Sequence, residues 1–183
     1  GVNARENQTK KNISSRKKNS KSCLQILGIS NFKYYELLDN QLDRYPLLQI
    51  VKIVENEIKS FRPTTIYTHF NNDINIDHQI VSKAVSTATR LNSDIENIFQ
   101  FEVLSSTELN NLNSSSNFIP NTFEDIKDYI DIKLKAFSSY KNEVKKWPHP
   151  RSKEGLKTLA KYRGMQSGRV FAEAFIQIRR FIK

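Results

Sequence analysis

The chain has 183 residues, close to the usual size of one domain, and 38% of them are hydrophobic, which excludes a disordered chain. No apolar run reaches the roughly 20 residues that a membrane-spanning helix needs. Lys and Arg number 29 against 19 Asp and Glu, so the net charge is +10, and the single cysteine, Cys23, excludes an internal disulfide framework. We expect one domain over residues 1–183 in a reducing, cytoplasmic compartment.

The first predicted elements are a helix, a strand and a second helix. A basic stretch over residues 4–27 predicts a mostly solvated helix that Gly28 ends. The aromatic run 32–38 predicts a strand. Apolar residues at helical spacing after Pro46 predict a helix over 46–60.

The middle of the chain predicts a strand, a loop, a helix and another strand. The β-branched run 64–68 is typical of a buried strand, and a polar loop over 69–77 follows it. One apolar face over 80–88 predicts a helix, and alternation over 99–106 predicts a strand.

The last part begins with a Ser- and Asn-rich loop over 107–121. Thr122 to Asp125 has the form of a capping box that opens a helix, and residues 152–163 predict another helix. A final strand is expected over 171–182. This order of elements predicts an α/β fold with a largely parallel sheet flanked by helices. Ligands of such sheets bind where strands end, so the loop from His69 to His78 is the first place to look for chemistry.

That loop gathers two histidines and two carboxylates within ten residues: His69, Asp73, Asp77 and His78. Imidazole and carboxylate groups are ligands of zinc and similar metals, and His78 lies at a helix start, where a ligand is held rigidly. A structural interpretation stays open, because Asp at a helix start commonly caps the helix and His in a polar loop is commonly structural.

A calcium loop is the second interpretation of this segment. Asp73, Asn75 and Asp77 match the first three ligand positions of an EF-hand. The sixth position should be Gly and is His78, and the twelfth should be Glu and is Ala84. The calcium interpretation is therefore excluded.

The segment from Ile66 to His78 resembles the second metal motif of the PIG-L/LmbE-like N-deacetylases. The resemblance extends over nearly the whole chain, through Leu38-Asp39-Asn40, the run 102–108, Pro148-His149-Pro150-Arg151 and Ala172-Glu173-Ala174. It implies a Rossmann-like α/β fold and a zinc-dependent hydrolase that removes acetyl groups from sugars of the N-acetylglucosamine type.

Two departures from the family pattern affect what the resemblance implies. The family's His-Pro-Asp-Asp-Glu stretch, which supplies two metal ligands and the general base, does not occur in this sequence. We therefore expect a partial domain that lacks the first βαβ piece and is inactive by itself. The second departure is Asn75, which stands where many members have a His, and His69 is the nearest substitute for that cationic group.

The resemblance assigns roles to eight residues. His78 is the expected zinc ligand. His69 and Asp73 are the expected catalytic residues, and Asp73 is expected to contact the ligand rather than the metal. The expected substrate-binding residues are Arg5, Asp39, Asn75, His149 and Arg151.

The net charge of +10 suggests anionic partners. The expected partner is an N-acetylated sugar conjugate, and the positive charge is compatible with a phosphate on that conjugate. The positive charge is also compatible with a peripheral contact to anionic membranes. The alternative is a basic nucleic-acid-binding or non-catalytic interaction module. Nucleic acid is not the expected partner, because the aromatic residues lie in runs predicted to be core.

Overall fold

The computed structural model describes residues 10–110 and 117–182, with the side chains of residues 10–13 outside that description. The chain forms two compact units. The first, here called the helical unit, comprises Gly1–Asp39 and Phe123–Glu173. The second, the sheet unit, comprises Asn40–Thr122 and Ala174–Lys183.

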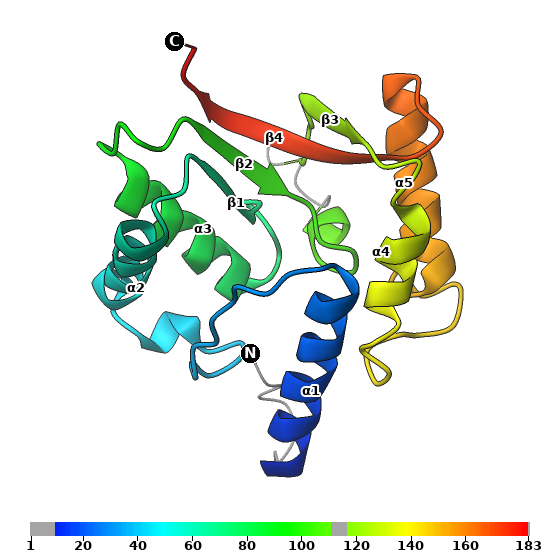
Figure 1. Ribbon diagram of the computed structural model, residues 1–183, viewed down its shortest axis with the longest axis horizontal. Helices are drawn as coiled ribbons and strands as arrows, with labels where there is room; N and C mark the ends of the chain where they lie inside the picture. Colours follow the sequence, from blue (N-terminus) through cyan, green and yellow to red (C-terminus); the bar gives the residue numbers. More distant parts are fainter. Residues whose placement is uncertain (1–9, 111–116, 183) are drawn as a thin grey trace. The chain divides into compact units, whose positions relative to one another are not determined.

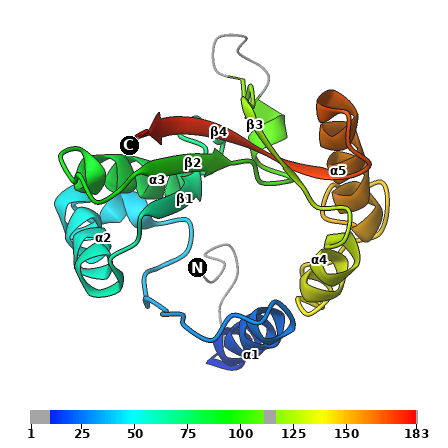
Figure 2. The ribbon, with the colours of Figure 1, turned by 45° about the horizontal axis from the view of Figure 1, so that its top comes forward.

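The sheet unit contains the predicted strand–helix–strand segment. Its elements are η1 (Leu42–Arg44), α2 (Leu47–Phe61), β1 (Thr65–His69), α3 (Ile76–Thr89) and β2 (Asn97–Phe101). Strands β1 and β2 are parallel, with His69 opposite Phe101 at the end of the ladder. Helix α3 packs against both β1 and α2 (Figure 2). The connection from β1 to β2 is thus a βαβ crossover, as the order of apolar patterns predicted.

The sheet has four strands in the order β1-β2-β4-β3 (Figure 1). Strand β4 (Ala172–Arg180) runs antiparallel to β2, and β3 is Thr122–Asp125. By sequence, β3 and β4 each contribute residues to both units. The α/β class is confirmed, with helices flanking a mixed sheet.

One face of the β1–β2 pair supplies the core of the sheet unit. Ile98 and Gln100 of β2 are buried, as is Thr68 of β1. The core also takes its apolar residues from the helices and the turn before β2: Ile50, Val51, Ala84, Val85 and Ile95. Tyr67 is 55% exposed, so the strand that was predicted to be buried is covered on one face only.

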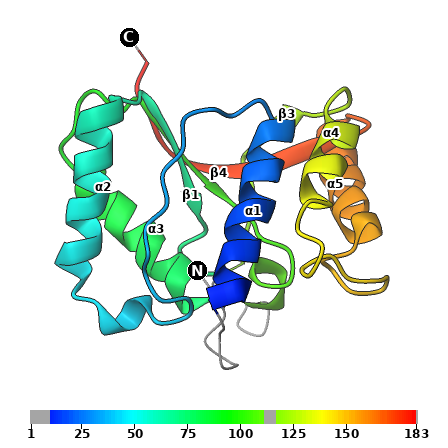
Figure 3. The same ribbon diagram turned by 60° about the horizontal axis from the view of Figure 1, so that its bottom comes forward.

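The helical unit holds α1 (Lys10–Ile26), α4 (Ile130–Phe137) and α5 (Lys153–Ser167). Helix α4 packs against both α1 and α5 (Figure 3). The core cluster of the helical unit consists of Ile126, Ile130 and Ala160. None of the helices in the described part of the chain is long and apolar enough to span a membrane.

The strand predicted over residues 32–38 is wrong, because this segment has no regular structure. Its side chains contact α1 instead: the Tyr34 hydroxyl donates to Ser20 Oγ at 2.9 Å, and Lys17 pairs with Glu36 at 2.6 Å. Tyr34, one of the aromatic residues that suggested a strand, thus makes a local contact with α1, and the ring of Phe32 packs against Tyr34.

The capping box predicted at Thr122 is also wrong. Residues 122–125 form strand β3, and α4 begins only at Ile130. Strand β2 is shorter than predicted, because the chain turns after Phe101 and the Val103 carbonyl accepts hydrogen bonds from the backbone N–H groups of residues 106 and 107.

Candidate metal and catalytic site

The ends of β1 and α3 bring His69, Asp73 and His78 together within the sheet unit. His69 is the last residue of β1. Helix α3 begins at Ile76 because Asn75 caps it, its side-chain oxygen accepting from the Asp77 N–H at 2.9 Å. The cap is therefore Asn75 rather than Asp77, and His78 lies in the first turn of the helix.

The two imidazole rings stack on each other. The ring centroids of His69 and His78 are 4.1 Å apart, with 16° between the ring planes. Phe101, opposite His69 in the parallel ladder, places its ring centroid 4.8 Å from that of His69. The ring of His69 thus contacts both the ring of Phe101, its partner in the ladder, and the second histidine.

Asp73 is a completely buried carboxylate whose oxygens are all engaged. The Asn75 backbone N–H donates to Oδ1 at 2.8 Å, the Thr107 hydroxyl donates to Oδ2 at 2.7 Å, and the Ser106 hydroxyl donates to Oδ1. Nδ1 of His78 lies 3.2 Å from Oδ1, at ion-pair distance, although the ring N–H does not meet hydrogen-bond geometry. These donors stabilise the ionised form of Asp73.

The electrostatics of the site follow from this arrangement. Burial by itself would raise the pKa of Asp73, but His78, the two hydroxyls and the Asn75 N–H outweigh burial and hold that pKa at about 2. Burial, and then the neighbouring His78, lower the pKa of His69 to about 4, against a smaller opposite effect of Asp73. At neutral pH the site thus contains an ionised carboxylate beside a neutral His69.

Three buried side-chain atoms of the described residues have no hydrogen-bond partner: Thr68 Oγ1, His69 Nδ1 and His78 Nδ1. All three belong to the β1–loop–α3 segment. Buried polar atoms in folded proteins are normally paired, so Thr68 Oγ1 and His69 Nδ1 are open to a water molecule, a ligand or an ion, whereas His78 Nδ1 lies 3.2 Å from Asp73.

The histidine and aspartate side chains of this segment are of the kinds that bind zinc, but they do not form a complete set of ligands. Among the residues that the structure describes, no three His, Cys, Asp or Glu side chains are arranged to hold a metal ion. The described residues of the His69–His78 segment therefore do not form a complete metal site by themselves.

Asp77 ties a second segment to the start of α3. Its Oδ2 accepts from the Asn40 N–H at 2.6 Å, and its Oδ1 accepts from the Leu42 N–H at 3.0 Å. Asn40 has a φ of 53°, in the left-handed region that Asn tolerates. Asp77 thus joins residues 40–42 to the helix turn that carries His78.

The remaining predicted site residues belong to the helical unit or lie outside the description. Arg5 is outside the described residues. Asp39 is 3.8 Å from Arg16, and Arg151 donates to Glu143 at 3.1 Å. The Arg151 backbone N–H donates to His149 Nδ1 at 2.9 Å. The structure therefore joins Asp39, Arg151 and His149 through neighbours in one unit.

Four residues of these contacts were not predicted: Ser106 and Thr107 around Asp73, Arg16 beside Asp39, and Glu143 beside Arg151. The hydroxyl run 105–107 was a signal for the first pair, since a buried carboxylate needs such donors. No sequence signal linked Arg16 to Glu143.

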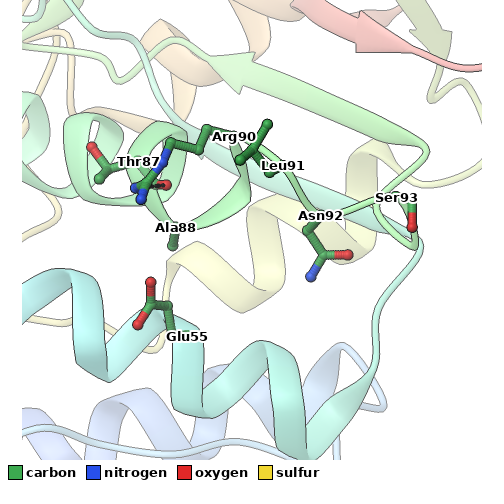
Figure 4. A pocket seen from close by; sticks show the side chains of 7 residues that line it. All are labelled: Glu55, Thr87, Ala88, Arg90, Leu91, Asn92 and Ser93. Atoms are coloured by element: carbon green, nitrogen blue, oxygen red, sulfur yellow. Dashed lines mark hydrogen bonds between the residues drawn. The ribbon is translucent and has the colours of Figure 1, made fainter.

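An open cleft of about 450 Å³ lies at the other end of α3, between Glu55 of α2 and the segment from Thr87 to Ser93 (Figure 4). The ten residue steps from His78 to Ala88 span about 15 Å of helix, and none of the predicted site residues lines this cleft. The candidate site is therefore not this cleft.

Comparison with known proteins agrees with the resemblance seen in the sequence. The PIG-L family model, described as GlcNAc-PI de-N-acetylase, matches residues 1–89. No curated protein sequence matches the chain.

Several solved structures share the fold. A conserved protein from Thermus thermophilus has a TM-score of 0.74 at 20% identity, covering 98% of this chain and 78% of that one. The N,N'-diacetylchitobiose deacetylase of Pyrococcus horikoshii has a TM-score of 0.75 at 16% identity, covering 97% and 68%. The zinc-inhibited form of teicoplanin deacetylase has a TM-score of 0.65 at 13% identity, covering 93% and 76%. The chain therefore has the fold of these deacetylases, and its residues 1–89, which contain the His69–His78 segment, match the PIG-L family.

Proposed function

We propose that the protein is a zinc-dependent N-deacetylase that removes the acetyl group of an N-acetylated sugar conjugate of the N-acetylglucosamine type. The PIG-L match covers the segment with both histidines, and similar structures include deacetylases of diacetylchitobiose and teicoplanin. The net charge of +10 is compatible with a phosphate on the conjugate and with peripheral contact to anionic membranes.

The observation that carries the proposal is the contact between Asp73 and His78. Histidines that bind metals commonly direct their other ring nitrogen at a carboxylate, which fixes the ring orientation. Nδ1 of His78 faces the buried, ionised Asp73 at 3.2 Å. The proposal therefore gives Nε2 of His78 to the metal.

The other residues of the chain take supporting roles. When bound, zinc lowers the pKa of a water molecule to about 7 and polarises the acetyl carbonyl. His69, neutral beside His78, offers a hydrogen bond to the reacting amide rather than a cation. Asn75 lies at the helix start next to this site, and Arg5, Asp39, His149 and Arg151 contact the sugar.

Among the described residues no three His, Cys, Asp or Glu side chains are grouped to hold a metal ion, and the sequence contains no His-Pro-Asp-Asp-Glu stretch. We therefore expect the 183-residue chain to have no deacetylase activity by itself. Activity requires the two further ligands and the base that the His-Pro-Asp-Asp-Glu stretch supplies in the family.

The test compares His78→Ala with Lys83→Ala, an exposed position on the same helix. Each variant is fused behind a βαβ piece that contains His-Pro-Asp-Asp-Glu, and zinc content and acetate release from N,N'-diacetylchitobiose are measured. His78→Ala should lose both zinc and activity, while Lys83→Ala keeps both. Stoichiometric zinc and normal turnover in His78→Ala would show that His78 is not a ligand.

A further inference from the structure

The chain makes a tight turn over residues 103–108, just after β2, and the centre of this turn is strained. Ser105 has a φ of 65°, in the left-handed region that residues other than glycine seldom adopt. The Val103 carbonyl accepts from the N–H groups of Ser106 at 3.2 Å and Thr107 at 2.9 Å. A strained backbone persists only where the surrounding contacts hold it, so this turn needs an anchor.

The Glu108 carboxylate is that anchor. Its Oε1 accepts from the Ser105 N–H, and its Oε2 accepts from the Ser106 N–H at 3.1 Å. Hydrogen bonds to an ionised acceptor are stronger than those between neutral groups. One side chain thus holds two successive N–H groups at the strained centre of the turn.

The turn presents two buried hydroxyls to Asp73. Ser106 and Thr107 are 4% and 3% exposed, and each donates its hydroxyl to a different oxygen of Asp73. Oγ1 of Thr107 also accepts from the Val103 N–H at 2.7 Å. The direction of the Thr107 hydroxyl is therefore fixed from both sides, and the orientation of the Asp73 carboxylate depends on the turn.

Asp73 in turn faces the ring of His78, with 3.2 Å between Oδ1 and Nδ1. A second tie runs beside this path, because the side-chain amide of Asn110 donates to the Asn72 carbonyl. All of these residues belong to the sheet unit. A row of contacts within one unit thus leads from Glu108, through the turn and Asp73, to His78.

We propose that Glu108 is a positioning residue for His78. By holding the 103–108 turn it sets the orientation of Asp73, and Asp73 keeps Nδ1 of the His78 ring directed at its own carboxylate. The proposal rests on the proposed function, in which Nε2 of His78 binds the metal, and it names the residue that fixes this orientation.

The first measurement is the ring tautomer of His78 in the metal-free 183-residue chain, read from the ¹⁵N chemical shifts of its two ring nitrogens. At pH 8 an ordinary histidine is neutral and carries its proton on one nitrogen. In the wild type the Nδ1–H form should exceed the Nε2–H form about tenfold, because its proton points at an ionised carboxylate. Glu108→Ala should lower this ratio about fivefold, because Asp73 is then no longer held in place.

Two sets of controls separate positioning from a loss of stability. Asp94→Ala removes an exposed acid from another turn of the same unit and should keep the wild-type ratio. If Glu108→Ala does not fold, Thr107→Val and Thr107→Ser replace it. Thr107→Val loses the hydroxyl that contacts Asp73 and should lower the ratio, whereas Thr107→Ser keeps the hydroxyl and should restore it.

The second measurement is the zinc dissociation constant of the chain fused behind the His-Pro-Asp-Asp-Glu piece. Glu108→Ala should weaken zinc binding about tenfold, and Asp94→Ala should leave it unchanged. An excess of the Nε2–H form in the wild type, an unchanged ratio in folded Glu108→Ala, or unchanged zinc affinity in that variant would each overturn the proposal. The tautomer is read without metal, so it can be as expected even where His78→Ala keeps its zinc, which is the result that refutes the proposed function.

Discussion

Asp73 shows at the scale of one residue how the site is held. A carboxylate with no exposed surface would normally be protonated or unstable, and here two hydroxyls, one backbone N–H and His78 compensate its burial. The pKa of Asp73 is lowered from an ordinary value of 3.8 to about 2. The charge of Asp73 therefore stabilises the folded state wherever the carboxyl is ionised.

This pKa predicts how stability depends on pH. Because the folded-state pKa is the lower one, the contribution of Asp73 is fully present above pH 4 to 5 and is lost as the pH falls toward about 2. The contribution is about 2 kcal/mol. Urea unfolding at a series of pH values should show Asp73→Asn losing the acid-dependent part of the stability seen in the wild type.

The control for this prediction is Asp131→Asn, an exposed position on α4. It should leave the free energy of unfolding within about 0.5 kcal/mol of the wild type and keep the same pH dependence. Identical pH profiles for the wild type and Asp73→Asn would show that the ionised carboxylate does not stabilise the fold.

The sequence predicted part of this site. His69, Asp73 and His78 were found because they fall within ten residues after a strand. Their partners were not found, because Ser106 is 33 residues from Asp73 along the chain, and Glu143 is 127 residues from Arg16. Such long-range contacts depend on the packing of the whole unit, which local patterns do not describe.

At the scale of elements, Asp77 connects the start of η1 and the residues just before it to helix α3. Its two oxygens accept from the N–H groups of Asn40 and Leu42, and Leu42 is itself buried. In Asp77→Ala both N–H groups lose their acceptor. We expect the free energy of unfolding to fall by about 2 kcal/mol, with faster hydrogen exchange at those two amides.

The matched control is Asp43→Ala, which removes an exposed acid from the same segment. It should leave exchange at Asn40 and Leu42 unchanged. If Asp77→Ala also leaves these two rates unchanged, Asp77 does not hold the segment.

Elements were predicted well where one pattern dominates and poorly where a side chain serves a local contact. The helix over 46–60 agrees with α2, because its apolar period and Pro46 coincide. The strand predicted over 32–38 is wrong, because the segment has no regular structure and Tyr34 and Glu36 contact α1. The motif at Thr122 failed, because a capping-box pattern does not exclude an extended backbone that finds a sheet partner.

At the scale of the whole molecule, the order of elements predicted the α/β class, and the resemblance predicted the deacetylase fold. Local patterns could not show that β4 runs antiparallel to β2, because strand direction depends on how the last connection returns to the sheet.

The net charge of +10 leads to a test of the alternative function, nucleic-acid binding. We expect only weak, sequence-independent binding of duplex and single-stranded oligonucleotides at low salt. The logarithm of the affinity should fall with log salt at a slope of about −0.9 per phosphate neutralised on the duplex, so little binding remains near 0.15 M.

The control is the double variant Lys141→Glu/Lys146→Glu. Both positions are exposed, and the two substitutions lower the net charge by 4, from +10 to +6. This variant should weaken oligonucleotide binding further. Tight oligonucleotide binding at 0.15 M salt that Lys141→Glu/Lys146→Glu abolishes, with no sugar binding, would make nucleic acid the partner in place of the sugar.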